Sequence, residues 1–201
     1  MKEGMPRTAP RRLVVGITGA SGVAYGVRLL ELLKQTDVES HLVMTDSAVI
    51  TLGYEMKLKV QDVHRLADVV HQNSDIGASL ASGSFKTLGM IVAPCSVKTL
   101  AAIATGYTDS LLARAADVAL KERRRLVLMV RETPLHLGHL RAMVAVTEAG
   151  AIVMPPVPAF YANPRSLDEM IDQTVGRALD LFDIETGKVK RWKPGSARGT
   201  K

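Results

Sequence analysis

The sequence is poor in cysteine and in long apolar runs, and each shortage excludes a class of protein. Its single cysteine, Cys95, leaves no internal disulfide and no multi-cysteine metal cluster. No apolar run approaches the ~20 residues that a membrane-spanning helix needs. The basic N-terminus lacks the apolar segment of a secretory signal. The sequence therefore predicts a soluble, reduced, cytoplasmic protein with no membrane partner.

Aromatic residues are also scarce, which bears on the meaning of the positive charge. A net charge of +6 is typical of some nucleic-acid binders. Aromatic side chains make up only 4% of the chain, too few to stack bases, and much of the positive charge lies near the two ends. We therefore expect flexible basic termini at residues 1–11 and 185–201, and no nucleic-acid partner.

Hydrophobic residues, by contrast, are plentiful and are arranged in an alternating pattern. They make up 47% of 201 residues, enough to bury the core of one domain, which we place at residues 12–184. Short β-rich runs predict strands at 12–18, 40–45, 89–95, 125–130 and 151–156. Helical patterns predict helices at 22–35, 46–55, 60–70, 96–106, 109–124, 137–150 and 167–184. This order favours an α/β fold, an open parallel sheet with helices on both faces.

Ligands of such sheets bind at the carboxyl ends of the strands, so the residues that follow each strand are the first candidates for a site. The first strand is followed by Gly19–Gly22, which does not have the G-x-G-x-x-G spacing of a dinucleotide site. The third strand is followed by Ser96–Thr99. Both turns open a helix, whose backbone N–H groups and dipole favour an anion. Together they predict a phosphate site, although helix capping alone also accounts for each serine.

Other polar residues stand at positions from which they can reach the same edge. They are Arg131 and Glu132 after the fourth strand, Arg114 and Lys121 on one helical face, Tyr161 in a proline-rich loop, and Arg177 in the last helix. A surface ion pair or a solvated helix face accounts for several of them equally well.

For three further residues, we expect a structural role rather than a chemical one. Cys95 lies between Pro94 and Ser96 at the end of a strand, where we expect a buried apolar residue rather than a nucleophile. His136 and His139 stand three residues apart, but no third ligand follows them. We therefore expect no metal site.

From Arg12 to Ile184, the chain resembles the flavin prenyltransferases of the UbiX type. The matching stretches, in the family's order, are GITGASG, LASGSFKTLGMIVAPCSVKTLAAI, RAADVALKERR, LVLMVRETPLHLGHL and MPPVPAFY. The resemblance implies a Rossmann-like or flavodoxin-like three-layer sandwich that binds FMN, assembled as a dodecamer with sites between subunits. It further implies metal-independent transfer of a dimethylallyl group from dimethylallyl phosphate to reduced FMN, whose prenylated product serves a partner decarboxylase.

The resemblance also assigns roles to particular residues. The implied FMN-binding residues are Gly19, Ala20, Ser21, Thr45, Ser96, Val97, Lys98, Thr99 and Arg131. The implied dimethylallyl phosphate-binding residues are Lys121, Tyr161 and Arg177. The implied catalytic residues are Ser21, Glu55, Lys121, Arg114 and Glu132.

Three rival functions remain open at this point. An FMN-dependent cysteine decarboxylase shares the fold, but its PASANT turn is replaced here by PCSVKT, and residues 44–55 contain no histidine. A flavin carrier would keep the FMN turns without needing Glu55, Lys121, Tyr161 and Arg177. A nucleic-acid binder would show strongly salt-dependent binding to duplex DNA.

Overall fold

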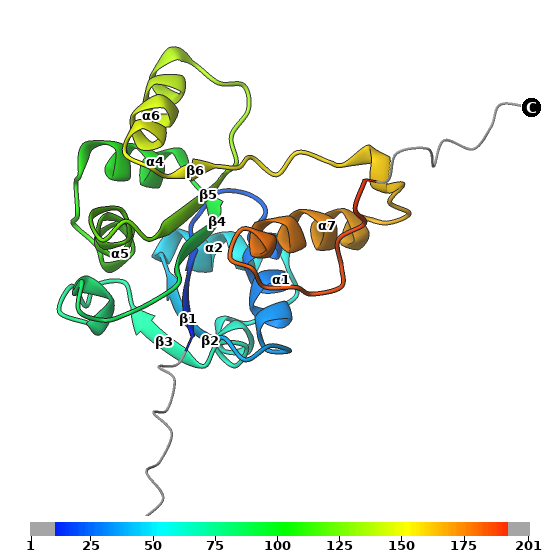
Figure 1. The fold of residues 1–201 in the computed structure, drawn as a ribbon, viewed down its shortest axis with the longest axis horizontal. Helices are drawn as coiled ribbons and strands as arrows, with labels where there is room; N and C mark the ends of the chain where they lie inside the picture. Colours follow the sequence, from blue (N-terminus) through cyan, green and yellow to red (C-terminus); the bar gives the residue numbers. More distant parts are fainter. Residues whose placement is uncertain (1–10, 193–201) are drawn as a thin grey trace, which may run out of the picture.

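The computed structural model describes residues 11–192 and contains one six-stranded sheet (Figure 1). The strand order is β3-β2-β1-β4-β5-β6, and every neighbouring pair is parallel. The strands are β1 (Arg12–Ile17), β2 (Glu39–Met44), β3 (Val69–Gln72), β4 (Gly89–Cys95), β5 (Arg125–Val130) and β6 (Ile152–Val153). The predicted open parallel sheet is confirmed.

Helices cover both faces of this sheet and make it the middle of three layers (Figure 1). They are α1 (Val23–Leu33), α2 (Asp46–Glu55), α3 (Val60–His64), α4 (Val97–Thr105), α5 (Leu111–Lys121), α6 (Leu137–Glu148) and α7 (Leu167–Asp180), with 3-10 turns η1 (Ser79–Ala81) and η2 (Phe160–Ala162). Side chains of α1, α2, α3 and α7 share one buried apolar cluster, and those of α4, α5 and α6 share another. The two clusters exist because successive strand residues, such as Leu13 and Val14, face opposite sides of the sheet.

Helix α1 lies unusually close to the centre of the sheet. A Cβ atom on Gly26 would come within 2.3 Å of the Ala93 carbonyl oxygen, so only glycine permits this approach. One stripe of apolar residues on this helix is fully buried: Val23, Val27, Leu30 and Leu33. The close contact fixes the start of α1 beside the carboxyl ends of β1 and β4.

The predicted helix at 60–70 is wrong in its second half. The helix ends at His64, and Val69–Gln72 forms edge strand β3, which was not predicted. The strand alternates between half-buried and exposed side chains, a weak pattern over four residues. The last strand is also shorter than predicted, because Pro155 and Pro156 have no N–H to donate to a neighbouring strand.

Side chains cap the starts of helices α2 and α7. Thr45 is the N-cap of α2, and its hydroxyl accepts a bond from the N–H of Ala48. Ser166 is the N-cap of α7. The Glu169 carboxylate in the first turn of α7 accepts from the N–H of Arg165 at 3.1 Å.

The predicted flexible termini fall partly outside the described residues, which exclude 1–10 and 193–201. Residues 185–192 are described, and they pack along α7. Among the described residues, no helix is both long enough and apolar enough to cross a bilayer.

Candidate functional site

A cavity of about 330 Å³ opens at the carboxyl edge of the sheet. Its walls come from the turns after β1, β2, β3 and β4 and from the first turns of α2, α4 and α5. The lining residues are Gly19, Thr45, Ser47, Asn73, Ser96, Lys98, Thr99, Ala102, Asp109, Ser110, Leu112 and Ala113. Five of the predicted FMN-binding residues are therefore brought together: Gly19, Thr45, Ser96, Lys98 and Thr99.

The start of α4 is held rigidly against the end of β1. The Ser96 backbone N–H donates to the hydroxyl of Thr18 at 2.8 Å, and Thr18 is only 1% exposed. The Ser96 hydroxyl accepts from the Thr99 N–H at 3.3 Å. The N–H groups of Val97 and Lys98 belong to the first turn, which has no intrahelical acceptors. They are available to an anionic ligand in the cavity.

The start of α2 forms a neighbouring wall of the cavity. Gly19 allows the turn after β1 to lie directly against this wall. A Cβ atom on Gly19 would lie 2.4 Å from the Cβ of Ser47, so a larger residue would push the turn away from α2. The hydroxyl of Thr51 donates to the Gly19 carbonyl at 3.1 Å and fixes this contact. The hydroxyls of Thr45 and Ser47 thus stand opposite those of α4.

At the start of α1, the structure places a carboxylate on the backbone N–H groups that the sequence suggests for an anion. The Glu55 carboxylate already accepts from the N–H groups of Gly22 at 2.8 Å and Val23 at 3.0 Å. A carboxylate from the end of α2 therefore caps α1. The cavity instead uses the first turns of α2 and α5 beside that of α4.

Glu55 is also the centre of a second cluster, which joins three predicted residues. Partial burial pushes the pKa of Glu55 upward, but hydrogen bonds from the Ser21 hydroxyl and the two N–H groups, with the charge of Arg131, hold that pKa below its ordinary value. Burial raises the pKa of the neighbouring Tyr25 phenol, against a smaller opposing effect of the Arg131 charge. Ser21, Glu55 and Arg131 therefore form one electrostatic unit.

The remaining cationic candidates on α5 are not brought to the cavity within one chain. The first turn of α5 lines the cavity, whereas Lys121 is its last residue. A helix of 11 residues is about 16 Å long, so Lys121 lies near the opposite edge of the sheet, where it pairs with Glu122. Arg114 contacts the Ala81 carbonyl oxygen at 3.3 Å instead of the cavity.

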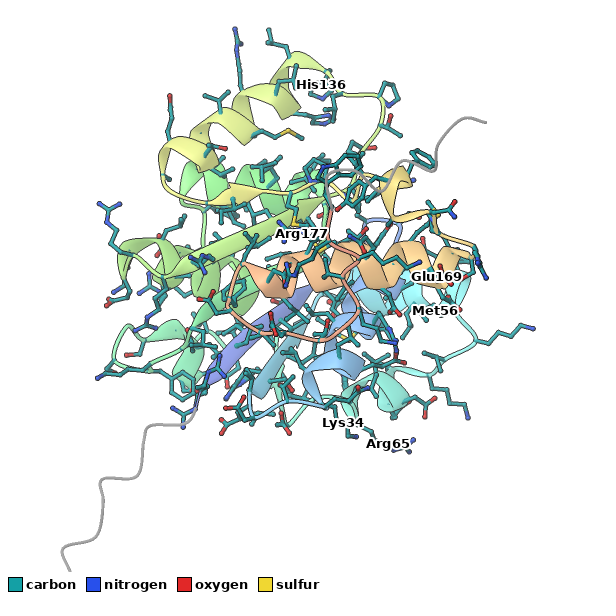
Figure 2. The ribbon with its side chains drawn as sticks, turned by 45° about the vertical axis from the view of Figure 1, so that its right-hand side comes forward. Lys34, Met56, Arg65, His136, Glu169 and Arg177 are labelled. Atoms are coloured by element: carbon teal, nitrogen blue, oxygen red, sulfur yellow. The ribbon has the colours of Figure 1, made fainter. Side chains whose placement is uncertain are left out.

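Tyr161, Arg177 and Glu132 also lie outside the cavity wall. The Tyr161 hydroxyl accepts from Nε2 of Gln173 at 3.3 Å. Arg177 stands four residues beyond Gln173 on α7 (Figure 2), so these two residues share a face of that helix. Arg177 pairs with Asp180. Glu132 accepts from the next residue's N–H at 3.0 Å.

Four polar residues of the cavity wall were not predicted from the sequence: Ser47, Asn73, Asp109 and Ser110. Asn73 follows the unpredicted strand β3, and its backbone and side-chain oxygens accept from the N–H groups of Leu111 and Leu112 at 2.8 and 3.1 Å. Ser110 precedes a strongly amphipathic helix and caps it, a signal that the sequence does carry.

The burial predicted for Cys95 is confirmed. Burial raises the pKa of the Cys95 thiol to about 12, so this thiol stays protonated at neutral pH. The rings of His136 and His139 are tilted by 32° relative to each other, with centroids 3.6 Å apart. Within residues 11–192, no three His, Cys, Asp or Glu side chains gather as metal ligands.

Comparison with known proteins identifies the family. A family model described as Flavoprotein matches residues 4–192. The flavin prenyltransferase UbiX of Thauera aromatica is 55% identical over 187 residues, which cover 93% of this chain and 96% of that protein. The chain belongs to the UbiX flavin prenyltransferases. The predicted activity and the predicted FMN cofactor are thereby confirmed, and the cysteine decarboxylase rival is set aside.

Solved structures of UbiX proteins agree with this assignment. AnUbiX (PadA1), crystallised in complex with FMN and dimethylallyl pyrophosphate, superposes with a TM-score of 0.91 at 54% identity, over 92% of this chain and 98% of that one. A dodecameric FMN-dependent UbiX-like decarboxylase from Escherichia coli O157:H7 gives a TM-score of 0.89 at 48% identity, over 90% and 99% of the two chains. The predicted fold class is confirmed.

Proposed function

We propose that this chain transfers the dimethylallyl group of dimethylallyl phosphate to reduced FMN, with the residues named below as the machinery. The observation that carries the proposal is the cavity at the carboxyl edge, where hydroxyls, helix N–H groups and Lys98 converge from separate segments. Such a donor set suits a phosphate monoester, and its walls are rigid elements.

FMN would be held through its phosphate by the starts of α2 and α4. Ser96, Thr99 and Lys98 supply hydroxyls and a positive charge, and Thr45 lines the same cavity from the end of β2. Gly19 lets the turn after β1 lie against Ser47 in the cavity wall, and Gly19 and Ala20 would contact the flavin there. When bound, the reduced flavin supplies the nucleophile that accepts the prenyl carbon.

Lys121, Tyr161 and Arg177 would bind the phosphate of the prenyl donor. Their positive charges and hydroxyl favour the departing phosphate over the ester, so they lower the barrier to cleavage of the carbon–oxygen bond without a metal ion. Because Lys121 lies at the far end of α5 from the cavity, we propose that a neighbouring subunit supplies it. A dodecamer, as in the Escherichia coli relative, is the assembly that we propose.

Ser21 and Glu55 would move protons during ring closure. Glu55 is ionised at neutral pH because its pKa is lowered, and it accepts a hydrogen bond from Ser21. The Ser21 hydroxyl can therefore take a proton from the flavin while passing its own to Glu55. Arg131 would stabilise this carboxylate and contact the flavin, and Arg114 and Glu132 would act as further polar groups once subunits assemble.

The product, prenylated FMN, would be delivered to a decarboxylase that depends on it. We place this exchange in the cytoplasm and assign the activity to a single flavoprotein domain at residues 12–184. Two observations support the domain assignment: a single sheet joins all six strands, and buried apolar clusters lie on both of its faces.

The proposal is tested by anaerobic incubation of the purified protein with reduced FMN and dimethylallyl phosphate, in the presence of a chelator. We expect the released flavin to gain the mass of one five-carbon unit. Parallel reactions with the diphosphate donor identify the preferred leaving group. Tight FMN binding with no mass gain from either donor would contradict the proposal and favour a flavin carrier.

A conservative variant tests the proton-transfer role. Glu55→Gln keeps an oxygen acceptor for the N–H groups of Gly22 and Val23 but removes the charge. We expect FMN binding to persist while prenylation slows by about 10²-fold or more, the usual contribution of general acid–base catalysis. Unimpaired prenylation by this variant would remove Glu55 from the mechanism.

A further inference from the structure

The segment after α7, Glu185–Trp192, doubles back along that helix and binds one stripe of it. Lys190 Nζ lies 3.3 Å from the Glu169 carboxylate at the start of α7, where Figure 2 shows Glu169 far from Arg177. Other contacts along the stripe join Lys188 to Asp172 at 3.5 Å, Lys190 to Gln173 at 2.8 Å and Arg191 to Asp180 at 2.9 Å.

Gln173 is the buried centre of this contact. The residue is only 3% exposed, yet both ends of its side-chain amide are used. Oε1 accepts from the Lys190 N–H at 2.8 Å, and Nε2 donates to the Lys190 carbonyl oxygen at 3.3 Å. The same Nε2 donates to the Tyr161 hydroxyl at 3.3 Å. One amide thus links the C-terminal segment to Tyr161.

Tyr161 is held on its other side by the end of the same segment. The Trp192 ring stands edge-on to the Tyr161 ring, with an interplanar angle of 86° and centroids 5.8 Å apart. Tyr161 is itself 51% exposed and sits in a short 3-10 turn, so few other contacts fix it. Its hydroxyl direction therefore depends on Gln173, and its ring on Trp192.

We propose that Gln173 is a positioning residue for prenyl-donor binding: it fixes the Tyr161 hydroxyl and ties it to the C-terminal segment. The inference rests on the proposed role of Tyr161 in gripping the donor phosphate. Since the segment reaches Arg177 as well, through Asp180, which pairs with both Arg177 and Arg191, one docked segment orders both residues.

The first test measures substrate affinity in the full-length protein. Gln173→Leu keeps a side chain of similar size but removes all three hydrogen bonds. We expect the KM for dimethylallyl phosphate to rise by about fivefold to tenfold, the effect of one lost hydrogen bond, while the dissociation constant of FMN stays unchanged. Gln173→Glu, which accepts from Lys190 but has no N–H for Tyr161, should raise the KM in the same direction.

A double-mutant cycle shows whether Gln173 acts through Tyr161. The Gln173→Leu and Tyr161→Phe double variant should raise the KM by clearly less than the product of the two single effects, because both changes remove the same contact with the Tyr161 hydroxyl. The matched control is Thr174→Val on the same helix, where, within residues 11–192, the hydroxyl bonds only to the Met170 carbonyl oxygen, at 2.9 Å. We expect this control to leave the KM unchanged.

A second readout does not depend on activity. Trp192 is the only tryptophan in the chain, so its fluorescence anisotropy reports docking of the segment. We expect Gln173→Leu to lower this anisotropy and Thr174→Val to preserve it. Unchanged KM and anisotropy in both Gln173 variants would overturn the inference, as would additive effects in the cycle. If the wild-type protein transfers no prenyl group, the proposed function fails instead. The anisotropy measurement still shows whether Gln173 holds the C-terminal segment against α7.

Discussion

At the scale of single residues, Glu55 has a structural duty besides its proposed chemical one. Its carboxylate accepts from both N–H groups at the start of α1. We expect Glu55→Ala to lower the free energy of unfolding by about 1 kcal/mol at neutral pH, the usual effect of a lost helix cap, and Glu55→Gln to cost less. Urea denaturation measures both.

The pH dependence of that difference follows from the lowered pKa of Glu55. A carboxyl whose folded pKa lies below its unfolded value stabilises the protein above the unfolded value, near 4.5, and the stabilisation is lost as the pH falls through the folded one. The gap between wild type and Glu55→Ala should therefore shrink in acid. A gap that widens in acid would contradict the assignment.

Gly19 makes the second prediction at this scale. The added methyl of Gly19→Ala would lie 2.4 Å from the Cβ of Ser47, so the turn must move out of the cavity wall. We expect FMN to bind at least about tenfold more weakly, a loss of about 1.4 kcal/mol, as measured by fluorescence titration. Gly53→Ala is the matched control, because its added methyl meets nothing within 4 Å and FMN binding should persist.

At the scale of elements, we expect the start of α4 to bind the phosphate of FMN rather than its flavin ring. Lys98 lines the cavity in the first turn of this helix. We expect Lys98→Gln to weaken FMN binding by about tenfold, within the range for a charge-assisted hydrogen bond. Riboflavin, which lacks the phosphate, should bind both proteins equally. Equally weakened binding of FMN and riboflavin would place Lys98 away from the phosphate. Lys57→Gln, on the exposed surface, is the control and should leave the binding of both flavins unchanged.

The fourth prediction concerns the pH dependence of stability, and it rests on His71 in the edge strand β3. His71 lies 3.0 Å from Nδ1 of His41 on β2, and burial, together with the His41 charge, lowers the pKa of His71. The unfolded chain therefore binds more protons than the folded one as the pH drops below the ordinary value of 6.5. The free energy of unfolding should fall from about pH 7.5 to about pH 5.5.

The variant that tests this is His71→Gln, in which the same fall should be smaller. The nearby carboxyls Glu39 and Asp68 do not confuse the measurement, because their pKa values are lowered and they titrate below this range. Identical slopes for the two proteins would show that His71 does not contribute.

The same elements show how far sequence reasoning reaches. Buried strands such as β1 and β4 are continuous apolar runs bounded by polar residues and glycine, so their limits can be predicted nearly to the residue. Strand β3 is an edge strand that pairs with β2 alone. Its four residues bury too little surface to show a clear apolar pattern in the sequence. Asn73 was missed with it, because a residue can be placed at a strand end only once the strand is known.

At the scale of the whole molecule, one chain brings some of the predicted site residues to the cavity and leaves others, such as Lys121, away from it. Residues of the strand ends converge because parallel strands share a carboxyl edge, and the sequence order alone predicts this. The distance from Lys121 to the cavity could not be predicted, because motif matching gives no position in space and no subunit contacts. Tyr161 and Arg177 show the same limit.

The last prediction concerns shared sites. If Lys121 serves a neighbouring chain, then Lys121→Ala and Glu55→Gln each inactivate every site in a pure assembly. Mixed assemblies, unfolded and refolded together, contain sites with both residues intact, up to about a quarter of all sites for random mixing. We expect prenylation to return in the mixture. Its absence, with assembly confirmed by light scattering, would place both residues in one chain's site.

Helix α5 begins at the cavity and ends at Lys121, so its length sets the position and direction of Lys121 relative to the cavity. Deleting one residue from the middle of the helix would turn everything beyond it by about 100° around the helix axis and draw it back by about 1.5 Å. The cavity of the same chain would keep its wall, while the lysine would point in a new direction. If Lys121 serves a neighbouring chain, as we propose, the number of residues in α5 is constrained as strictly as their identity.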